Sequence, residues 1–518
     1  MENEAGQQKK WTYGLLVLVI VYALVRSVIA AANKDFWYDE FLTLTVSSLD
    51  SLRAVWAALC APLDGQPPLF YVIERALLGF SKKQEVALRL PSILALTCTL
   101  ACVFAYARKR SGDLVAFLCI GFLLTTCLFQ LYAVEARPYS LVMACFAFAL
   151  VCYQRAPAPA WMTLLGLSLF TAQSLHYLAI LSMVPFGLAE GAVWLKGRKF
   201  RPWVWGALVF GATPALIFWK LIAINKAYYG GPRFWARFQF SYIPEAYGEY
   251  LLSKSHLGAA IAAAAIVSVV APWSAAFGSG TLRPRNGEDG SRKTDETSSA
   301  LVEAIMLGTF VALPFLALVF AKVTHSGLTP RYVLPTILGI TLAFGAALSR
   351  AGKRLVLLFG VFVVSSLGIQ ELHFWRFPEL GLLDSKLNIA ESAKFIERGS
   401  QGNLPIVFPN GMAMLELAHY APPSFQPAKR FIYLTRDTDP TWPDTLDKGY
   451  KILERYMPLR VAERQAFTAA HSEFLLYGTD LENQSITRSL IEEGWNVRVV
   501  AADGHRAMYL ASSAPNSR

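Results

Sequence analysis

Long apolar segments recur along this chain and constrain its fold more than any other feature of the sequence. A helix needs about 20 mainly apolar residues to cross a bilayer, and fewer where neighbouring helices shield it. Only 16% of the residues are charged, compared with roughly 25% in a typical soluble protein, so the chain has little surface suited to water. The sequence therefore predicts an α-helical polytopic membrane protein with about eleven transmembrane helices. The candidate segments are 12–32, 88–107, 113–131, 136–153, 161–175, 177–195, 203–224, 256–277, 300–322, 332–349 and 355–371.

The basic residues indicate which side of the membrane each loop faces. The formal net charge is +11, but the Lys and Arg residues form short clusters between apolar segments and no extended patch, which argues against nucleic-acid binding. Clusters of this kind mark cytoplasmic loops. With the N-terminus in the cytoplasm, all clusters between closely spaced segments fall on the inner side. These clusters lie at 108–110, 155, 196–201, 283–293 and 350–354.

The same topology places three long segments outside: 33–87, 225–255 and the tail from 372. The transmembrane domain is predicted to comprise residues 1–371. Within it, 278–299 (GSGTLRPRNGEDGSRKTDETSS) has the composition of a flexible linker and is expected in the cytoplasm. In 372–518, short β-rich runs alternate with helical patterns, which predicts a small outer α/β domain with a partly parallel sheet. The tail contains no Gly-rich phosphate-binding motif, so no nucleotide site is indicated.

The first outer loop, 33–87, contains two amphipathic stretches. Apolar residues recur at helical spacing in 49–59 and again in 69–80, where Pro67 and Pro68 are suited to begin a helix. Both stretches are too short or too charged to span a bilayer. They are expected to be helices that lie in the membrane interface.

Two adjacent acids, Asp39 and Glu40, follow the first apolar segment in FWYDEFLTL. The ordinary interpretation is a solvated helix N-terminus, where acidic side chains interact favourably with the helix dipole. However, aromatic residues flank the pair, and burying acids beside aromatic rings is unfavourable unless the acids are paired or functional. A functional role is therefore the stronger hypothesis.

Further polar pairs occur at three helix ends that are predicted to face outward. A single His or Arg at such a position usually caps the helix or extends to the membrane surface. Here, three helix ends carry such groups, and all three are predicted on the same side of the membrane as Asp39 and Glu40. This arrangement favours a shared site instead. The pairs are Glu135 and Arg137, His176 and Tyr177, and Arg331 and Tyr332.

These motifs together resemble those of the GT-C fold glycosyltransferases. The most similar group contains the protein O-mannosyltransferases and the lipid A aminoarabinose transferases. The resemblance covers roughly residues 12–350, and the tail matches only as the soluble outer domain that many members carry. The motifs that carry the resemblance are YDE, DGQPPLFY, ALRLPS, EARPYS, a mid-chain HY and PRYVLP.

The resemblance implies a polyprenyl-phosphate-linked sugar as the donor, with transfer on the outer face of a plasma membrane, in particular a bacterial inner membrane. It assigns Asp39 as the base or acceptor-positioning group, with Glu40 in support, and Arg137 as the ligand of the lipid phosphate. Relatives carry His or Lys before the Pro pair, whereas this chain has Gln66. Mannose and aminoarabinose, the sugars of these two groups of relatives, are therefore not assigned to this chain. The acceptor could be a protein, a lipid or a polysaccharide.

The implied chemistry suits these residues. A phosphate leaving group needs cations, which Arg137 and Arg331 can supply in a site with little water. A carboxylate with a pKa near about 4 is a weak base, so proton transfer has to accompany attack on the anomeric carbon. One base without a covalent nucleophile predicts a single displacement with inversion. No ligand spacing requires a divalent metal, and none excludes it.

Two other functions are compatible with such a chain. A lipid or sugar transporter or flippase would show internal repeats and polar groups at mid-membrane, whereas no repeat is evident and the polar residues cluster on one face. A receptor or binding module could use the tail, with the transmembrane helices as its anchor. An anchor, however, needs far fewer than the eleven predicted spans.

Overall fold

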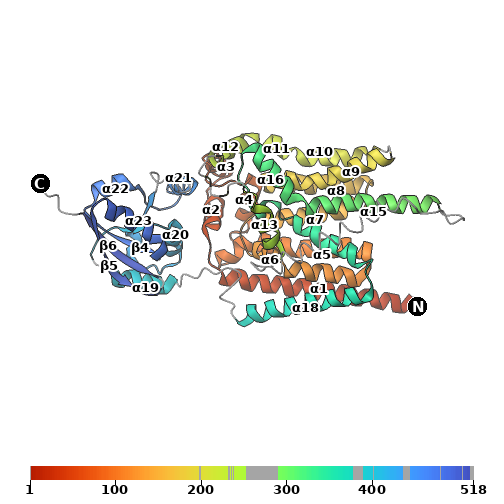
Figure 1. Cartoon of the computed structure of the whole chain (residues 1–518), viewed down its shortest axis with the longest axis horizontal. Helices are drawn as coiled ribbons and strands as arrows, with labels where there is room; N and C mark the ends of the chain where they lie inside the picture. The colour runs from red at the N-terminus through yellow and green to blue at the C-terminus, as the bar shows by residue number, and fades with distance from the viewer. Residues whose placement is uncertain are drawn as a thin grey trace. The chain divides into compact units, whose positions relative to one another are not determined.

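The computed structural model describes residues 2–197, 200–230, 234, 236, 239–251, 290–376, 389–400, 402–435, 444–478, 480–504 and 506–513. The chain forms two compact units, and Figure 1 labels their elements. The first, which we call the helical unit, comprises 1–34, 66–226 and 236–382. The second, the α/β unit, comprises 35–65, 227–235 and 383–518.

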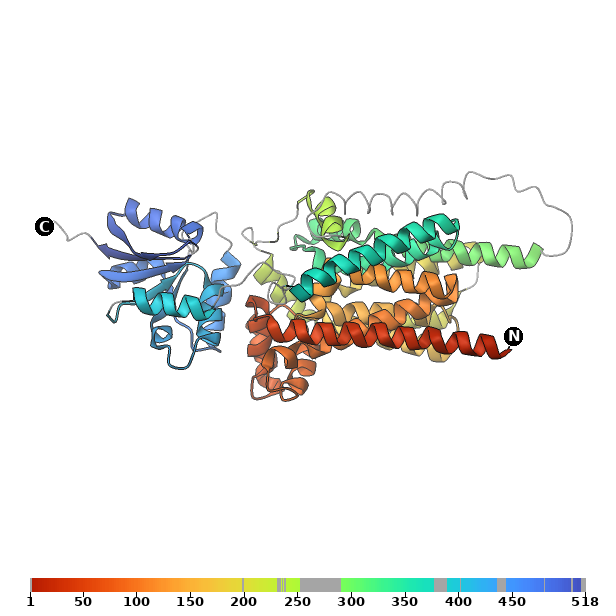
Figure 2. The same cartoon turned by 90° about the horizontal axis from the view of Figure 1, so that it is seen from below.

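The long helices of the helical unit run side by side (Figure 2). Helix α5 contacts α1, α7, α17 and α18, so it lies inside the bundle. The elements are α1 (Glu2–Asn33), α4 (Pro68–Leu77), α5 (Gln84–Thr125), α6 (Cys127–Ala133), α7 (Tyr139–Tyr153), α8 (Pro159–Leu175), η1 (Tyr177–Met183), α9 (Val184–Gly197), α10 (Pro202–Ala212), α11 (Pro214–Ile217), α12 (Trp219–Tyr229, which continues into the α/β unit), α13 (Tyr242–Leu251), α15 (Gly290–Val311), α16 (Leu313–Thr324), η2 (Pro330–Val333), α17 (Thr336–Leu348) and α18 (Lys353–Arg376).

The predicted apolar segments coincide with helices wherever the structure describes them, whereas 256–277 lies outside the described residues. Helix α5 contains the predicted segment 88–107 and most of 113–131, whose end lies in α6, and Gly112 with a φ of +83° lies between the two segments. This left-handed conformation favours glycine and breaks the helix between the two segments. Residues 290–299, which the sequence assigns to the linker, begin α15, and 278–289 lie outside the described residues.

Length and hydropathy identify four described helices as able to cross a membrane, or up to six if each of two bent pairs forms one span. One of these pairs, α15 and α16, is bent by 56°. Pro314, near the start of α16, explains this bend, because proline lacks the amide hydrogen that a continuous helix needs. The total of eleven spans stays a prediction.

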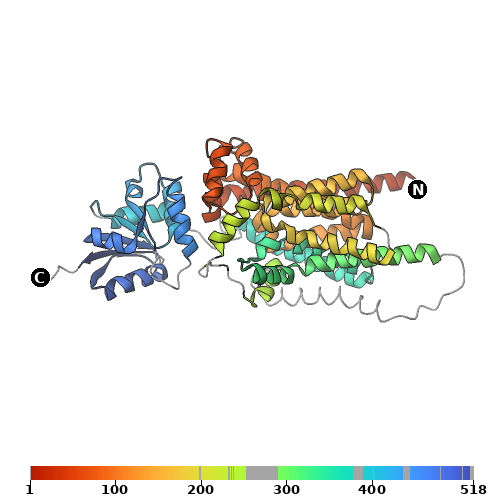
Figure 3. The same cartoon turned by 90° about the horizontal axis from the view of Figure 1, so that it is seen from above.

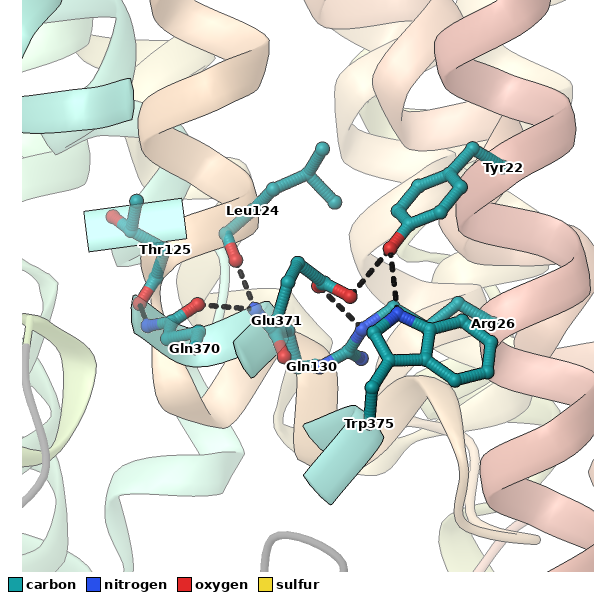
Figure 4. Close-up of polar contacts among 8 residues, drawn as sticks. All are labelled: Tyr22, Arg26, Leu124, Thr125, Gln130, Gln370, Glu371 and Trp375. Atoms are coloured by element: carbon teal, nitrogen blue, oxygen red, sulfur yellow. Dashed lines mark hydrogen bonds and ion pairs between the residues drawn. The ribbon is translucent and has the colours of Figure 1, made fainter. Parts of the chain in front are cut away.

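Polar side chains join α18 to α1 and to the end of α5 (Figure 4). Arg26 Nε of α1 lies 2.6 Å from Glu371 Oε1, and Tyr22 Oη donates a hydrogen bond of 2.5 Å to Glu371 Oε2. Nε2 of the preceding residue, Gln370, donates to the backbone oxygen of Thr125 at 2.8 Å. Adjacent residues of α18 thus bind α1 and the end of α5.

The α/β unit contains a six-stranded sheet in the order β3-β2-β1-β4-β6-β5, with helices on both of its faces (Figure 3). Strand β1 pairs in parallel with β2 and β4, and β2 pairs in parallel with β3. Strand β6 pairs antiparallel with β4 and β5. The predicted partly parallel sheet is therefore confirmed. Its core includes Val407, Ile432, Leu434, Phe474 and Leu476.

The elements of the α/β unit come from distant parts of the chain. They are α2 (Tyr38–Ser47), α3 (Leu52–Cys60), α19 (Ile389–Gly399), β1 (Ile406–Phe408), α20 (Gly411–Tyr420), η4 (Gln426–Arg430), β2 (Phe431–Thr435), α21 (Asp444–Leu453), β3 (Val461–Glu463), α22 (Arg464–Ala470), β4 (Glu473–Gly478), α23 (Asp480–Glu492), β5 (Trp495–Ala502) and β6 (Ala507–Ser513). The two predicted amphipathic helices exist as α3 and α4. Their location at the membrane interface stays a prediction.

Candidate active site

The turn between α6 and α7 carries Glu135 and Arg137, and both are buried. The Arg137 amide donates to the backbone oxygen of Glu135 at 2.8 Å, and Ser92 Oγ of α5 donates to the backbone oxygen of Arg137 at 3.1 Å. Glu135 Oε1 lies 3.1 Å from Lys34 Nζ. The turn is therefore tied both to α5 and to the residue that follows α1.

Arg89 is a structural residue that the sequence analysis missed. Its side chain is fully buried in α5, and its Nη1 donates to the backbone oxygens of Ala31 at 2.8 Å and Lys34 at 2.5 Å. A buried guanidinium that binds carbonyl oxygens fixes the backbone where the chain leaves α1. The detectable signal was an Arg inside the apolar stretch ALRLPS.

His176 joins three helix ends of the helical unit. It is buried at the end of α8, and its Nδ1 accepts a hydrogen bond from the Leu178 amide at 3.2 Å. Its ring centroid lies 5.5 Å from that of Tyr139 and 5.3 Å from that of Tyr332. The chain thus brings the start of α7 and the short helix η2 to the α8–η1 junction.

The electrostatic surroundings keep His176 neutral. Burial, together with the positive charges of Arg137 and Arg331, lowers the pKa of His176 to about 3. Because Nδ1 accepts a hydrogen bond, the proton of the neutral ring is assigned to Nε2. The ring can therefore donate a hydrogen bond without adding charge.

Arg331 lies at this junction as well. Its guanidinium carbon is 5.6 Å from the ring centroid of Tyr139 and 5.9 Å from that of Tyr332. Helix α13 holds the backbone around it: Tyr250 Oη donates to the backbone oxygen of Pro330 at 2.7 Å. Residues 242–251, which form α13, carry no motif that predicts a part in the site.

Helix α13 also brings a carboxylate toward Arg331. Burial and the nearby Glu245 raise the pKa of Glu249, while the positive charge of Arg331 opposes this rise. Glu249 thus contributes to the electrostatics of the same junction.

Two predicted residues of the helical unit are less closely linked to this junction. Tyr177 begins η1, and its backbone oxygen accepts a hydrogen bond from Gln173 Nε2 at 2.8 Å. Gln66 is buried directly before the proline pair that begins α4. Helix α4 packs against α5 and α8.

Asp39 and Glu40 belong to the α/β unit, where both lie in the first turn of α2. Glu40 is fully buried, and its Oε2 accepts a hydrogen bond from the Trp37 amide at 3.4 Å. Asp39 is half-buried. The acids do begin a helix, as the ordinary interpretation requires, but the burial of Glu40 contradicts a fully solvated helix N-terminus.

No group of three or more His, Cys, Asp or Glu residues suited to a metal ion occurs within the described ranges.

No protein-family model matches the chain, and no curated protein matches its sequence. Two solved structures are similar over nearly its whole length. ArnT from Cupriavidus metallidurans in the apo state gives a TM-score of 0.58 at 14% sequence identity, covering 97% of this chain and 99% of that chain. The chain has the fold of ArnT.

ArnT from the same organism bound to undecaprenyl phosphate gives a TM-score of 0.52 at 15% identity, with the same coverage. The likeness to ArnT confirms the predicted GT-C resemblance at the level of the fold. The link to the O-mannosyltransferases stays a prediction.

Proposed function

We propose that this protein is a membrane glycosyltransferase that moves a sugar from a polyprenyl-phosphate donor to an acceptor hydroxyl or amine on the outer face of a bacterial inner membrane. The observation that carries this proposal is the junction in the helical unit where Arg137 and Arg331 act on a neutral, buried His176. The fold supports it, because ArnT, a lipid A aminoarabinose transferase, has been solved with undecaprenyl phosphate bound.

The charge of the junction suits a phosphate. Arg137, Arg331 and Lys34 contribute three positive charges, whereas Glu135 and Glu249 contribute at most two negative charges. Guanidinium groups bind phosphate oxygens through paired hydrogen bonds, which are strong where water is scarce. In this proposal Arg137 is the main phosphate ligand and Arg331 the second. His176, Tyr177 and Tyr332 complete the donor site as neutral groups.

Asp39 is the base in this proposal. Its carboxylate accepts the proton of the acceptor O–H or N–H while the acceptor atom forms a bond to the anomeric carbon. The bond between that carbon and the phosphate oxygen breaks, and the oxygen leaves with the electron pair as polyprenyl phosphate. Arginine side chains stabilise the charge that develops on this leaving group. A single displacement of this kind inverts the anomeric configuration.

Gln66 bears on which sugar is transferred. It is buried and uncharged where relatives carry Lys or His, so it offers amide hydrogen bonds in place of a cation. Pentosyl and hexosyl donors both remain candidates, as do protein, lipid and polysaccharide acceptors.

The proposal is tested by separating donor binding from turnover. Purified protein in nanodiscs is incubated with a panel of radiolabelled undecaprenyl-phosphate sugars and membrane extract as the source of acceptor. Sugar transfer that undecaprenyl phosphate inhibits and undecaprenol does not would support the enzyme. Donor binding without transfer, together with movement of the lipid across a vesicle membrane, would contradict it and favour a flippase.

A further inference from the structure

Within the α/β unit, α2 packs on the C-terminal domain through aromatic residues on either side of Asp39 and Glu40. Phe36 and Phe41 are fully buried. The ring of Phe41 lies 5.3 Å from that of His419, and the ring of Phe36 lies 6.4 Å from that of Tyr420. The Phe36 amide also donates a hydrogen bond of 2.8 Å to Tyr420 Oη. The end of α20 thus holds both the backbone before α2 and its first turn.

A second contact forms around Tyr38, the residue before Asp39. Its ring centroid lies 5.2 Å from that of Tyr450 in α21, and Tyr450 lies 4.3 Å from Tyr433 in β2. Tyr433 Oη in turn donates to Asp447 Oδ1 at 2.7 Å, and Asp447 is fully buried. A column of three tyrosines therefore runs from α2 to the central sheet.

Gly449 makes the close approach of Tyr38 possible. A Cβ atom at position 449 would lie only 2.5 Å from Tyr38 Oη. Any larger residue there would displace the tyrosine, although Gly449 lies inside α21, where alanine is the better helix former.

We infer that the C-terminal domain positions the catalytic carboxylate: Tyr420, Tyr450 and Gly449 hold α2 so that Asp39 keeps one orientation. This inference rests on the proposed function and adds a role for the domain. None of the three residues is a catalytic residue. They act through the backbone of α2 and through Tyr38, because a base must be held within a fraction of an ångström of its working position.

Two variants test this inference without removing a packed side chain. Tyr420→Phe keeps the ring but removes the oxygen that accepts from the Phe36 amide, and Gly449→Ala adds one methyl group against Tyr38. Each should lower kcat about 10- to 100-fold, as small displacements of a catalytic group do, while KM for the donor lipid stays unchanged. Gly504→Ala is the matched control, since a Cβ there meets no atom within 4 Å.

Hydrogen–deuterium exchange reports on positioning independently of turnover. Amides in residues 36–47 should exchange faster in both variants than in the wild type or in Gly504→Ala, while protection of β1, β2 and β4 is retained. Faster exchange with unchanged kcat would overturn the inference, as would unchanged exchange. If the wild type transfers no sugar, the proposed function fails first, and the positioning of Asp39 for this reaction fails with it. The exchange result would then show only whether the domain holds α2.

Discussion

At the scale of single residues, the acid pair of α2 divides into two roles. Glu40 is buried and accepts from the Trp37 amide, so it stabilises the start of the helix, whereas Asp39 is only half-buried. We predict that Asp39→Asn, which keeps the shape and removes the basicity, folds and binds donor lipid but loses about 100-fold or more in transfer rate. Glu40→Gln should have a smaller effect, because the amide oxygen can still accept. Normal transfer by Asp39→Asn, or a loss confined to Glu40→Gln, would assign the base elsewhere.

Arg137 is predicted to bind the donor phosphate. Arg137→Ala should weaken the binding of undecaprenyl phosphate by about tenfold or more, because a charged hydrogen-bond donor is lost. Arg137→Lys should also be impaired, since an ammonium cannot reproduce the planar guanidinium. Lipid binding to the purified variants measures both effects, with Arg155→Ala as a control at a predicted cytoplasmic cluster. Wild-type affinity in Arg137→Ala would refute the assignment.

His176 gives the folded protein a distinct pH dependence. Its pKa is lowered to about 3 by burial and by Arg137 and Arg331, whereas an unfolded His has a pKa near about 6.5. Between these values the unfolded chain binds more protons, so the free energy of unfolding falls as the pH drops below about 6.5. His176→Gln should remove this contribution. Melting temperatures at pH 7.5 and 5.5 measure it, and an equal drop in both proteins would contradict the prediction.

At the scale of elements, α18 is attached to α1 by a partly buried ion pair between Arg26 and Glu371, and the Arg26 guanidinium carbon lies 4.2 Å from the ring centroid of Phe374. Glu371→Gln leaves the charge of Arg26 without its carboxylate, which lies 2.6 Å away in the native protein. Removing one partner of a buried pair costs about 3 kcal/mol or more, and we expect a loss of that order, reduced where the pair is partly exposed. Unfolding of the purified protein in detergent measures it.

The double variant Arg26→Met with Glu371→Leu is the control for this experiment, because it replaces both charges with apolar groups. It should recover most of the lost stability, since replacement of both partners is often neutral. A double variant that is less stable than Glu371→Gln would show that the ion pair is not the cause.

At the scale of the whole molecule, the one-sided basic clusters predict the membrane orientation. The N-terminus should be cytoplasmic and residues 372–518 external. An alkaline phosphatase fused after residue 518 should therefore be active, and a cytoplasmic fluorescent reporter at the same position should be dark. The reverse pattern would overturn the odd number of spans together with the orientation.

The sequence by itself determined the helices and strands, because their signals are local. Apolar segments mark the bundle helices, and the separate segments 88–107 and 113–131 predict an interruption, which the structure places at Gly112 of α5. Short β-rich runs mark five of the strands. The pair Asp39 and Glu40 is detectable because aromatic residues flank it. Strand β3 (Val461–Glu463) was missed because its three residues are only partly buried or exposed and include no apolar run, whereas the equally short β1 (Ile406–Phe408) is fully buried and apolar.

Only the tertiary structure decided which of these elements meet. Arg89 binds the carbonyl oxygens at the end of α1, more than 50 residues earlier in the chain. Tyr420 accepts from the amide of Phe36 across an even longer separation. No periodicity encodes such contacts, because they depend on the packing of whole elements and on atoms of the backbone that every residue carries. For the same reason the sequence could nominate Asp39, but the role of the C-terminal domain in holding α2 follows only from the fold.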